Sequence, residues 1–193
     1  AAEEAAVQEA VPQEAVAQED EPANRPPAEY QEPVLIHFDR EINGISEQYL
    51  YRKLDAAESL GADLLIIQIE SPGGEVDATL RMAWHLAGIK WARTVAYIPD
   101  YALSGGAILS MGCDDIIMDP NAQIGDVGVI AEDLGMYQYV PEKALTPFIE
   151  DVRNLAEEKG RPPGLADAMI NMDVVLWKVK NKDTGKVTFM TEK

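Results

Sequence analysis

The chain has 193 residues, of which 47% are hydrophobic, enough for the core of one domain of ordinary size. Its formal net charge of -18 argues against nucleic-acid binding and against docking on anionic lipid, since both partners are polyanions. The single cysteine, Cys113, excludes an internal disulfide framework. No residues have metal-ligand spacing, and neither G-x-G-x-x-G nor a P-loop is present, so we expect no metal and no cofactor.

Composition divides the chain into two parts. Residues 1–32 consist mainly of alanine, glutamate, glutamine and proline, with no aromatic residue before Tyr30. Such a segment cannot bury enough apolar surface to offset the entropy of ordering it. We therefore predict a disordered acidic tether at residues 1–32 and one domain at residues 33–193. The chain begins at Ala1 without methionine and has no bilayer-length apolar run, so we expect any signal peptide or membrane segment to lie outside it.

From residue 33 onward, strand and helix patterns alternate. A helix with Ser46 as its N-cap should separate the first two strands and stop at Gly61. The second strand is an almost continuous apolar run, typical of a strand buried on both faces. The next helix carries an apolar stripe that includes Trp84. The predicted strands are 33–40, 63–70, 94–99 and 115–119, and the helices after the second and third strands are 75–89 and 104–112.

This alternation predicts an α/β domain with a mainly parallel sheet. A later helix should run over residues 146–160, with Thr146 as cap and Pro147 in its first turn. The segment 174–190 has the pattern of a hairpin that turns at "KDTG".

Two glycine pairs follow the second and third predicted strands. Gly73 and Gly74 stand in "ESPGGEV", and Gly105 and Gly106 stand in "YALSGGAILS". Ligands of open α/β sheets bind outside the carboxyl ends of the strands. Glycine also lets a ligand approach the backbone amides closely. Both pairs are therefore expected at one ligand-binding edge.

Ser104 precedes the second glycine pair and opens a helix. Acyl transfer needs a nucleophilic hydroxyl and amide donors directed at a developing oxyanion. Ser104 suits the nucleophile, with the N–H of Gly105 and one N–H from Gly73 or Gly74 as the oxyanion hole. A simpler role for Ser104 as an N-cap alone stays open. The segment is not a G-x-S-x-G elbow, because Ala102 replaces the first glycine.

These segments resemble the ClpP/crotonase superfamily, and most closely the membrane-bound serine proteases of the NfeD group, which are related to signal peptide peptidase A. The resemblance covers roughly residues 33–170. It implies ClpP/crotonase-like repeated βα units, with "SPGG" as the oxyanion-hole loop and "ALSGGAILSMGCDDIIMDPNAQIGDVGVI" as the nucleophile segment. By this resemblance Ser104 matches the catalytic serine.

The general base is the point at which the chain departs from the family. NfeD-type enzymes use a lysine as the general base. The segment "TPFIEDVRNLAEEKGRP" resembles the helix that carries this lysine, and here Arg153 occupies its position. Arginine cannot accept a proton near neutrality. Lys143 is a substitute candidate, although pairing with Glu142 would raise its pKa rather than lower it. His37 and His85 lie in apolar strand and helix patterns and are expected to be structural.

Three functions follow as hypotheses. The first is a serine peptidase that cleaves apolar peptide segments. By resemblance its substrates are peptides or membrane proteins, it has a stomatin-type partner, it forms homo-oligomers, and it is extracytoplasmic and membrane-associated through a membrane segment and a β-barrel domain that this chain lacks. The second is an inactive protease-fold scaffold in membrane quality control, favoured by Arg153. The third is a crotonase-type acyl-CoA enzyme, which uses the same two-amide oxyanion hole.

Overall fold

The structure is a computed structural model that describes residues 29–133, 136–140 and 145–191. The predicted tether therefore lies almost wholly outside the described residues. Two of its last residues are tied to the domain, because the backbone N–H groups of Gln31 and Glu32 donate to the carboxylate of Asp63 at 2.7 and 3.0 Å. These two residues are therefore anchored to the domain.

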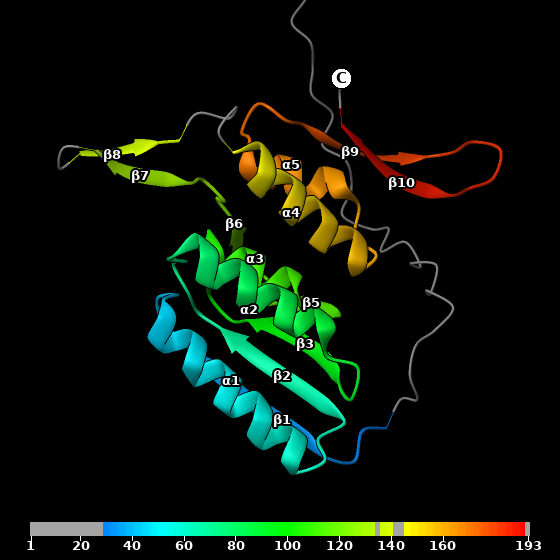
Figure 1. Cartoon of the computed structure of the whole chain (residues 1–193). Helices are drawn as coiled ribbons and strands as arrows, with labels where there is room; N and C mark the ends of the chain where they lie inside the picture. The colour runs from blue at the N-terminus through cyan, green and yellow to red at the C-terminus, as the bar shows by residue number, and fades with distance from the viewer. Residues whose placement is uncertain (1–28, 134–135, 141–144, 192–193) are drawn as a thin grey trace, which may run out of the picture.

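Strands and helices alternate as predicted (Figure 1). The first part of the chain forms β1 (Pro33–Phe38), α1 (Gly44–Ser59), β2 (Leu64–Ile69), α2 (Val76–Gly88), β3 (Arg93–Ile98), β4 (Tyr101–Leu103), α3 (Gly105–Met111), β5 (Asp115–Met118) and β6 (Gln123–Gly125). The second part forms β7 (Ile130–Asp133), β8 (Met136–Tyr139), α4 (Thr146–Glu158), α5 (Pro163–Ile170), β9 (Leu176–Lys180) and β10 (Val187–Thr191).

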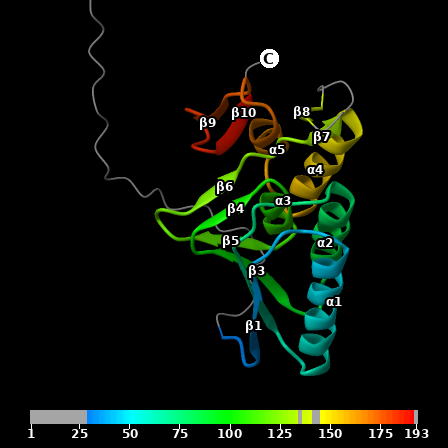
Figure 2. The same cartoon turned by 90° about the vertical axis from the view of Figure 1, so that its left-hand side faces the viewer.

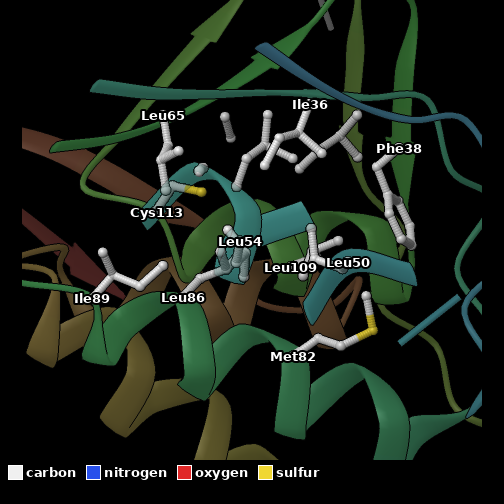
Figure 3. Close-up of a cluster of buried hydrophobic side chains, with 14 of the residues drawn as sticks. Ile36, Phe38, Leu50, Leu54, Leu65, Met82, Leu86, Ile89, Leu109 and Cys113 are labelled. Atoms are coloured by element: carbon white, nitrogen blue, oxygen red, sulfur yellow. The ribbon is translucent and has the colours of Figure 1, made fainter. Parts of the chain in front are cut away.

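The central sheet has the order β1-β2-β3-β5, and all of its pairings are parallel. This confirms the predicted α/β class with a mainly parallel sheet. The helices α1 and α2 lie on the same face of the sheet (Figure 2). Figure 3 shows the core between these helices and the sheet, where Phe38, Leu50 and Met82 are fully buried.

The prediction that the second strand is buried on both faces is wrong. Burial alternates along β2, with Leu65, Ile67 and Ile69 inaccessible and the residues between them partly exposed. The reason is that both helices cover one face only. The predicted apolar stripe of α2 is also partly wrong. Trp84 was expected on the buried stripe but is 38% exposed, whereas Met82 and Leu86 are fully buried.

β3 and β5 are each followed, after a short break, by a strand of a second, smaller sheet. β4 follows β3, β6 follows β5, and the two pair in parallel. Isolated bridges add Ser71 beside Ala102 and Gly74 beside Ile42. This layer brings the loop after β2 next to the end of β4.

Two predicted helix caps differ from the structure by a few residues. The N-cap of α1 is Asn43, whose side chain accepts from the N–H groups of Ile45 and Ser46. Ser46 is the third residue of the helix, and its hydroxyl accepts from the N–H of Asn43, which completes a capping box. The N-cap of α4 is Leu145 rather than Thr146, which is the first helical residue.

The C-terminal third was predicted less completely. The segment "GRPPGLADAMIN" contains the helix α5, which packs against α4. The predicted hairpin exists as β9–β10, and a second hairpin, β7–β8, was not predicted. The two hairpins project on opposite sides of α4 and α5 (Figure 1).

Candidate active site

The loop after β2 has a backbone that only glycine adopts readily. Gly73 has φ 99° and Gly74 has φ 153°. A Cβ on Gly74 would lie 2.0 Å from the carbonyl oxygen of Ile42, which is part of the backbone and cannot turn away. The buried hydroxyl of Ser71 orders this loop, since it donates to the carbonyl of Arg40 at 2.7 Å and accepts from the N–H of Gly73 at 3.2 Å.

Ser104 stands at the junction of β4 and α3 with a strained backbone. Its φ is 50° and its ψ is -119°, a conformation that a residue with a side chain seldom adopts. Its N–H donates to the carbonyl of Gly125 at 2.8 Å, which fixes the turn to the end of β6. Ser104 is the N-cap of α3 by position, but its side chain makes no capping hydrogen bond. A capping hydrogen bond therefore does not account for the strained backbone of Ser104.

The structure brings the two glycine loops together around this serine. A Cβ built on Gly73 would lie 2.7 Å from the amide nitrogen of Gly105 and 3.0 Å from Oγ of Ser104. A Cβ on Gly105 would lie 2.5 Å from Oγ1 of Thr79. Glycine is therefore required on both sides for the loops to approach this closely.

Two amide groups at this contact have no backbone partner among the described residues. Within the described residues, neither Gly74 nor Gly105 donates its backbone N–H to another backbone group, whereas the N–H of Gly73 is held by Ser71. Helix α3 also begins at Gly105, so its positive dipole end faces Ser104. The arrangement can thus offer two N–H donors to a negative oxygen beside the hydroxyl.

Ser104 and all three predicted oxyanion-hole glycines line one pocket of about 360 Å³. The pocket is bounded by the segment that follows β6, with Val127 and Val129, and by Phe148 in the first turn of α4. The N–H of Val127 donates to the carbonyl of Met169 in α5 at 2.9 Å, which ties this wall to the helix pair.

The described residues supply no conventional base to this pocket. Its titratable lining residues are Glu41 and Asp126, and no lysine or histidine of the described residues lines it. His37 lies on the exposed face of β1, and His85 stacks on Tyr51 with ring centroids 4.5 Å apart. Lys143 lies outside the described residues.

Arg153 is placed away from this pocket by its ion pairs. Its guanidinium donates to the carboxylates of Asp167 and Glu150 and does not line the pocket. The hydrogen bond that Arg153 donates to the carboxylate of Asp167 is the main reason that the pKa of Arg153 is held above the ordinary arginine value. A guanidinium in this state cannot take a proton from Ser104.

Cys113 does not offer an alternative nucleophile. Its side chain is fully buried, and burial raises the pKa of the thiol to about 12. A buried thiol of this kind is inert, because the thiolate is the reactive form.

Three polar residues at the site were not among the predicted site residues. Ser71 positions the glycine loop, and the side chain of Thr79 lies directly beside Gly105. Asp126 lines the pocket and has an unusual positive φ of 53°. Only Ser71 carried a signal, since it belongs to the "SPGG" segment. The other two come from a helix and a loop whose approach depends on the three-dimensional fold.

Two further findings concern the described part of the chain alone. No cluster of three or more His, Cys, Asp or Glu side chains that could hold a metal ion is found there. None of its helices has the length and hydropathy needed to cross a bilayer.

The structure is similar to solved structures of a membrane-bound protease and of ClpP1. A serine-to-alanine mutant of the 1510-N membrane-bound stomatin-specific protease of Pyrococcus horikoshii matches with a TM-score of 0.67 and 25% identity, over 73% of this chain and 70% of that chain. A lysine-to-alanine mutant of 1510-N in complex with a substrate peptide matches equally well over 66% of its chain. ClpP1 from Listeria monocytogenes matches with a TM-score of 0.55 and 19% identity over 70% of this chain and 77% of that chain, which shows a shared fold.

The fold is thus the α/β fold of ClpP-like proteases. The family model described as NfeD1b, N-terminal domain, matches residues 34–193, and the chain belongs to this family. Among curated relatives, the membrane protein NfeD1b of Bacillus subtilis is 28% identical over 147 residues, and the membrane-bound protease PH1510 of P. horikoshii is 28% identical over 155 residues. These matches cover 76% and 75% of this chain, which spans about a third of each relative's length, 33% and 35%.

Proposed function

We propose that this chain is a serine peptidase domain of the NfeD class with Ser104 as its nucleophile. The observation that carries the proposal is the strained backbone of Ser104 beside two unused amides in one pocket. Strain of this kind costs about 1–3 kcal/mol and is commonly retained at functional sites. The named solved relatives are proteases, which favours peptide hydrolysis over acyl-CoA chemistry.

In this proposal the N–H groups of Gly74 and Gly105 form the oxyanion hole. Gly73 leaves room for the substrate carbonyl, while its own N–H stays bound to Ser71. The Ser104 oxygen attacks the peptide carbonyl carbon, its proton passes to a base, and the base then protonates the leaving amine. Water hydrolyses the resulting acyl-enzyme by the same route.

Lys143 is a better candidate for the general base than Arg153. The two 1510-N structures carry mutations at a serine and at a lysine 41 positions further along that chain. In this chain Lys143 lies 39 positions after Ser104, whereas Arg153 lies 49 positions after it. The residues that flank 141–144, Val140 and Leu145, line a cavity that shares Asp126 with the Ser104 pocket. Arg153 is therefore assigned to structure through Asp167 and not to catalysis.

The substrate and setting follow from the relatives by analogy. An apolar pocket wall of Val127, Ile130 and Phe148 suits apolar peptide segments. The names of these relatives support a membrane-associated setting, a peptide or membrane-protein substrate and a stomatin-type partner. The extracytoplasmic location is proposed from the family resemblance alone. We include homo-oligomerisation in the same proposal.

A catalytically inactive scaffold is the second candidate. It is favoured by the absence of lysine and histidine from the described lining of the pocket. If the scaffold hypothesis holds, wild-type protein is inert whatever the state of Lys143.

A peptide library of apolar sequences, assayed across a pH range, distinguishes the two. We expect wild type to cleave, with activity rising as pH increases because a lysine acts as base only when neutral. Lys143→Ala should lower kcat by roughly 10²–10⁴, as expected for a lost general base. Arg153→Lys should leave kcat within a small factor of wild type. Cleavage that survives Ser104→Ala, or indifference to Lys143→Ala, would contradict the assignment.

A further inference from the structure

The pocket beside Ser104 shares a wall with a second cavity. This cavity, also of about 360 Å³, is bordered mainly by apolar side chains, among them Val129 and Met169 of the described residues. Asp126, Gly128 and Val129 line both spaces. A peptide that extends from one space into the other therefore passes Asp126.

Backbone hydrogen bonds on both sides hold Asp126 in place. The carbonyl of Gly125 accepts from the N–H of Ser104 at 2.8 Å, and the N–H of Val127 donates to the carbonyl of Met169 at 2.9 Å. Asp126 itself has φ 53°, a left-handed conformation that aspartate tolerates better than most residues. The backbone therefore holds this exposed aspartate at the wall of the pocket, one residue away from the partner of the Ser104 amide.

The two spaces carry negative charge that no described residue neutralises. Their titratable lining residues are Glu41, Asp126 and Asp173, and no lysine, arginine or histidine of the described residues lines either space. Within the part of the chain that the structure describes, neither Glu41 nor Asp126 uses its carboxylate in a hydrogen bond or an ion pair. Of the three carboxylates, only that of Asp126 lines both spaces. A cationic group can therefore meet Asp126 from either space, but each of the others from one space only.

We infer that Asp126 makes the site select a peptide that carries a positively charged group beside its apolar residues. An opposite charge is attracted to the free carboxylate, whereas a like charge in the same place is repelled. Both effects strengthen when a bound peptide excludes water from the pocket. A lysine or arginine side chain of the peptide, or its free N-terminal amine, can supply the positive charge. The inference rests on the proposed peptidase function and adds a charge preference to it.

Pairing with the proposed base, Lys143, is a less suitable role for Asp126. A nearby carboxylate raises the pKa of a lysine and keeps it protonated, which opposes its action as a base. A cationic group of the substrate has no such conflict, because it takes no part in proton transfer. The two roles also differ in a measurable way, since only the second makes binding depend on the charge of the peptide.

The test measures peptide affinity by fluorescence anisotropy with Ser104→Ala, which lacks the nucleophile. The peptides share one apolar sequence with an acetylated N-terminus, and they carry lysine, arginine, glutamine or glutamate at a single position that is moved along the peptide. We expect one position at which lysine and arginine bind at least about fivefold more tightly than glutamate, with glutamine between them. Added salt should reduce this difference, because it screens the charges.

A second substitution on the Ser104→Ala background links the preference to one carboxylate. Asp126→Asn keeps the shape of the side chain and tolerates the positive φ, so it should remove most of the preference. Asp119→Asn is the matched control, because it changes an exposed aspartate that lines neither space, and it should keep the full preference. A peptide with a free N-terminus and no lysine or arginine identifies the source of the charge. Tighter binding of this peptide than of its acetylated form would assign the positive group to the N-terminal amine.

Several outcomes would overturn the inference. They are no measurable binding, equal affinity for all charges, a preference that persists in Asp126→Asn, and an equal loss in Asp119→Asn. If Asp126→Asn instead shifted the pH profile of wild-type cleavage alike for every peptide and left their order unchanged, Asp126 would act on the base, which would also overturn it. Because affinity is measured without the nucleophile, an inactive wild type would refute the peptidase proposal while the charge preference is decided separately.

Discussion

At the scale of single residues, the space beside Ser104 is the feature most open to a direct test. Gly73→Ala places a methyl group 2.7 Å from the amide nitrogen of Gly105 and 3.0 Å from the serine hydroxyl. We expect peptidase kcat to fall by about 10²–10³, the usual loss when one oxyanion donor is removed. Gly88→Ala is the matched control, since a Cβ there meets nothing within 4 Å. If both variants were folded and fully active, the loop would have no role in the chemistry.

Sequence reasoning indicated this serine because the order and spacing of its neighbours carry a local signal. Its strained φ could not be predicted, since "YALSGG" lacks the first glycine of the common elbow motif. Sequence alone was also insufficient to identify the N-cap of α1, which was predicted to be Ser46. Asn43 and Ser46 are both good cap residues, and only the backbone shows which of them stands before the first turn.

At the scale of elements, a buried ion pair joins α4 to the sheet. Lys159, whose side chain is only 4% exposed, donates from Nζ to the carboxylate of Asp114 at 2.7 Å. The same carboxylate accepts from the N–H and hydroxyl of Thr94. Because α4 also supplies Phe148 to the pocket, this pair helps to position one wall of the site.

Asp114→Asn should therefore be costly. It leaves the Lys159 ammonium buried without its counter-charge, which we expect to lower the free energy of unfolding by about 3 kcal/mol in urea titration. Asp115→Asn, which breaks the more exposed pair with Arg93, should cost less than about 1 kcal/mol. Equal losses would show that burial of the Lys159 pair carries no special weight.

The same aspartate gives a pH dependence with a defined sign. Partial burial raises the pKa of Asp114, but the hydrogen bonds from Lys159 and Thr94 outweigh it and hold the pKa below its usual value. A lowered pKa means that the stabilisation is fully present above the unfolded pKa of about 3.9 and is lost as pH falls through the folded pKa. The Asn variant should lack this part of the acid-induced loss of stability.

At the scale of the whole molecule, the α/β class followed from the alternation of strands and helices, because each segment carries its own periodicity. The second layer of β4 and β6 did not, since three-residue strands have no periodic signal. One-sided helix cover was also missed, because a continuous apolar run such as β2 does not show which face is open. These features decide where the two loops meet, so sequence alone could propose the site but not its geometry.

The central claim is that Ser104 is an activated nucleophile. A fluorophosphonate probe forms a covalent bond only with such a serine, and mass spectrometry of the labelled peptide identifies the residue. The account predicts one label per chain on Ser104, none in Ser104→Ala, and much slower labelling in Lys143→Ala. An unlabelled wild type, or a label on any other residue, would contradict it.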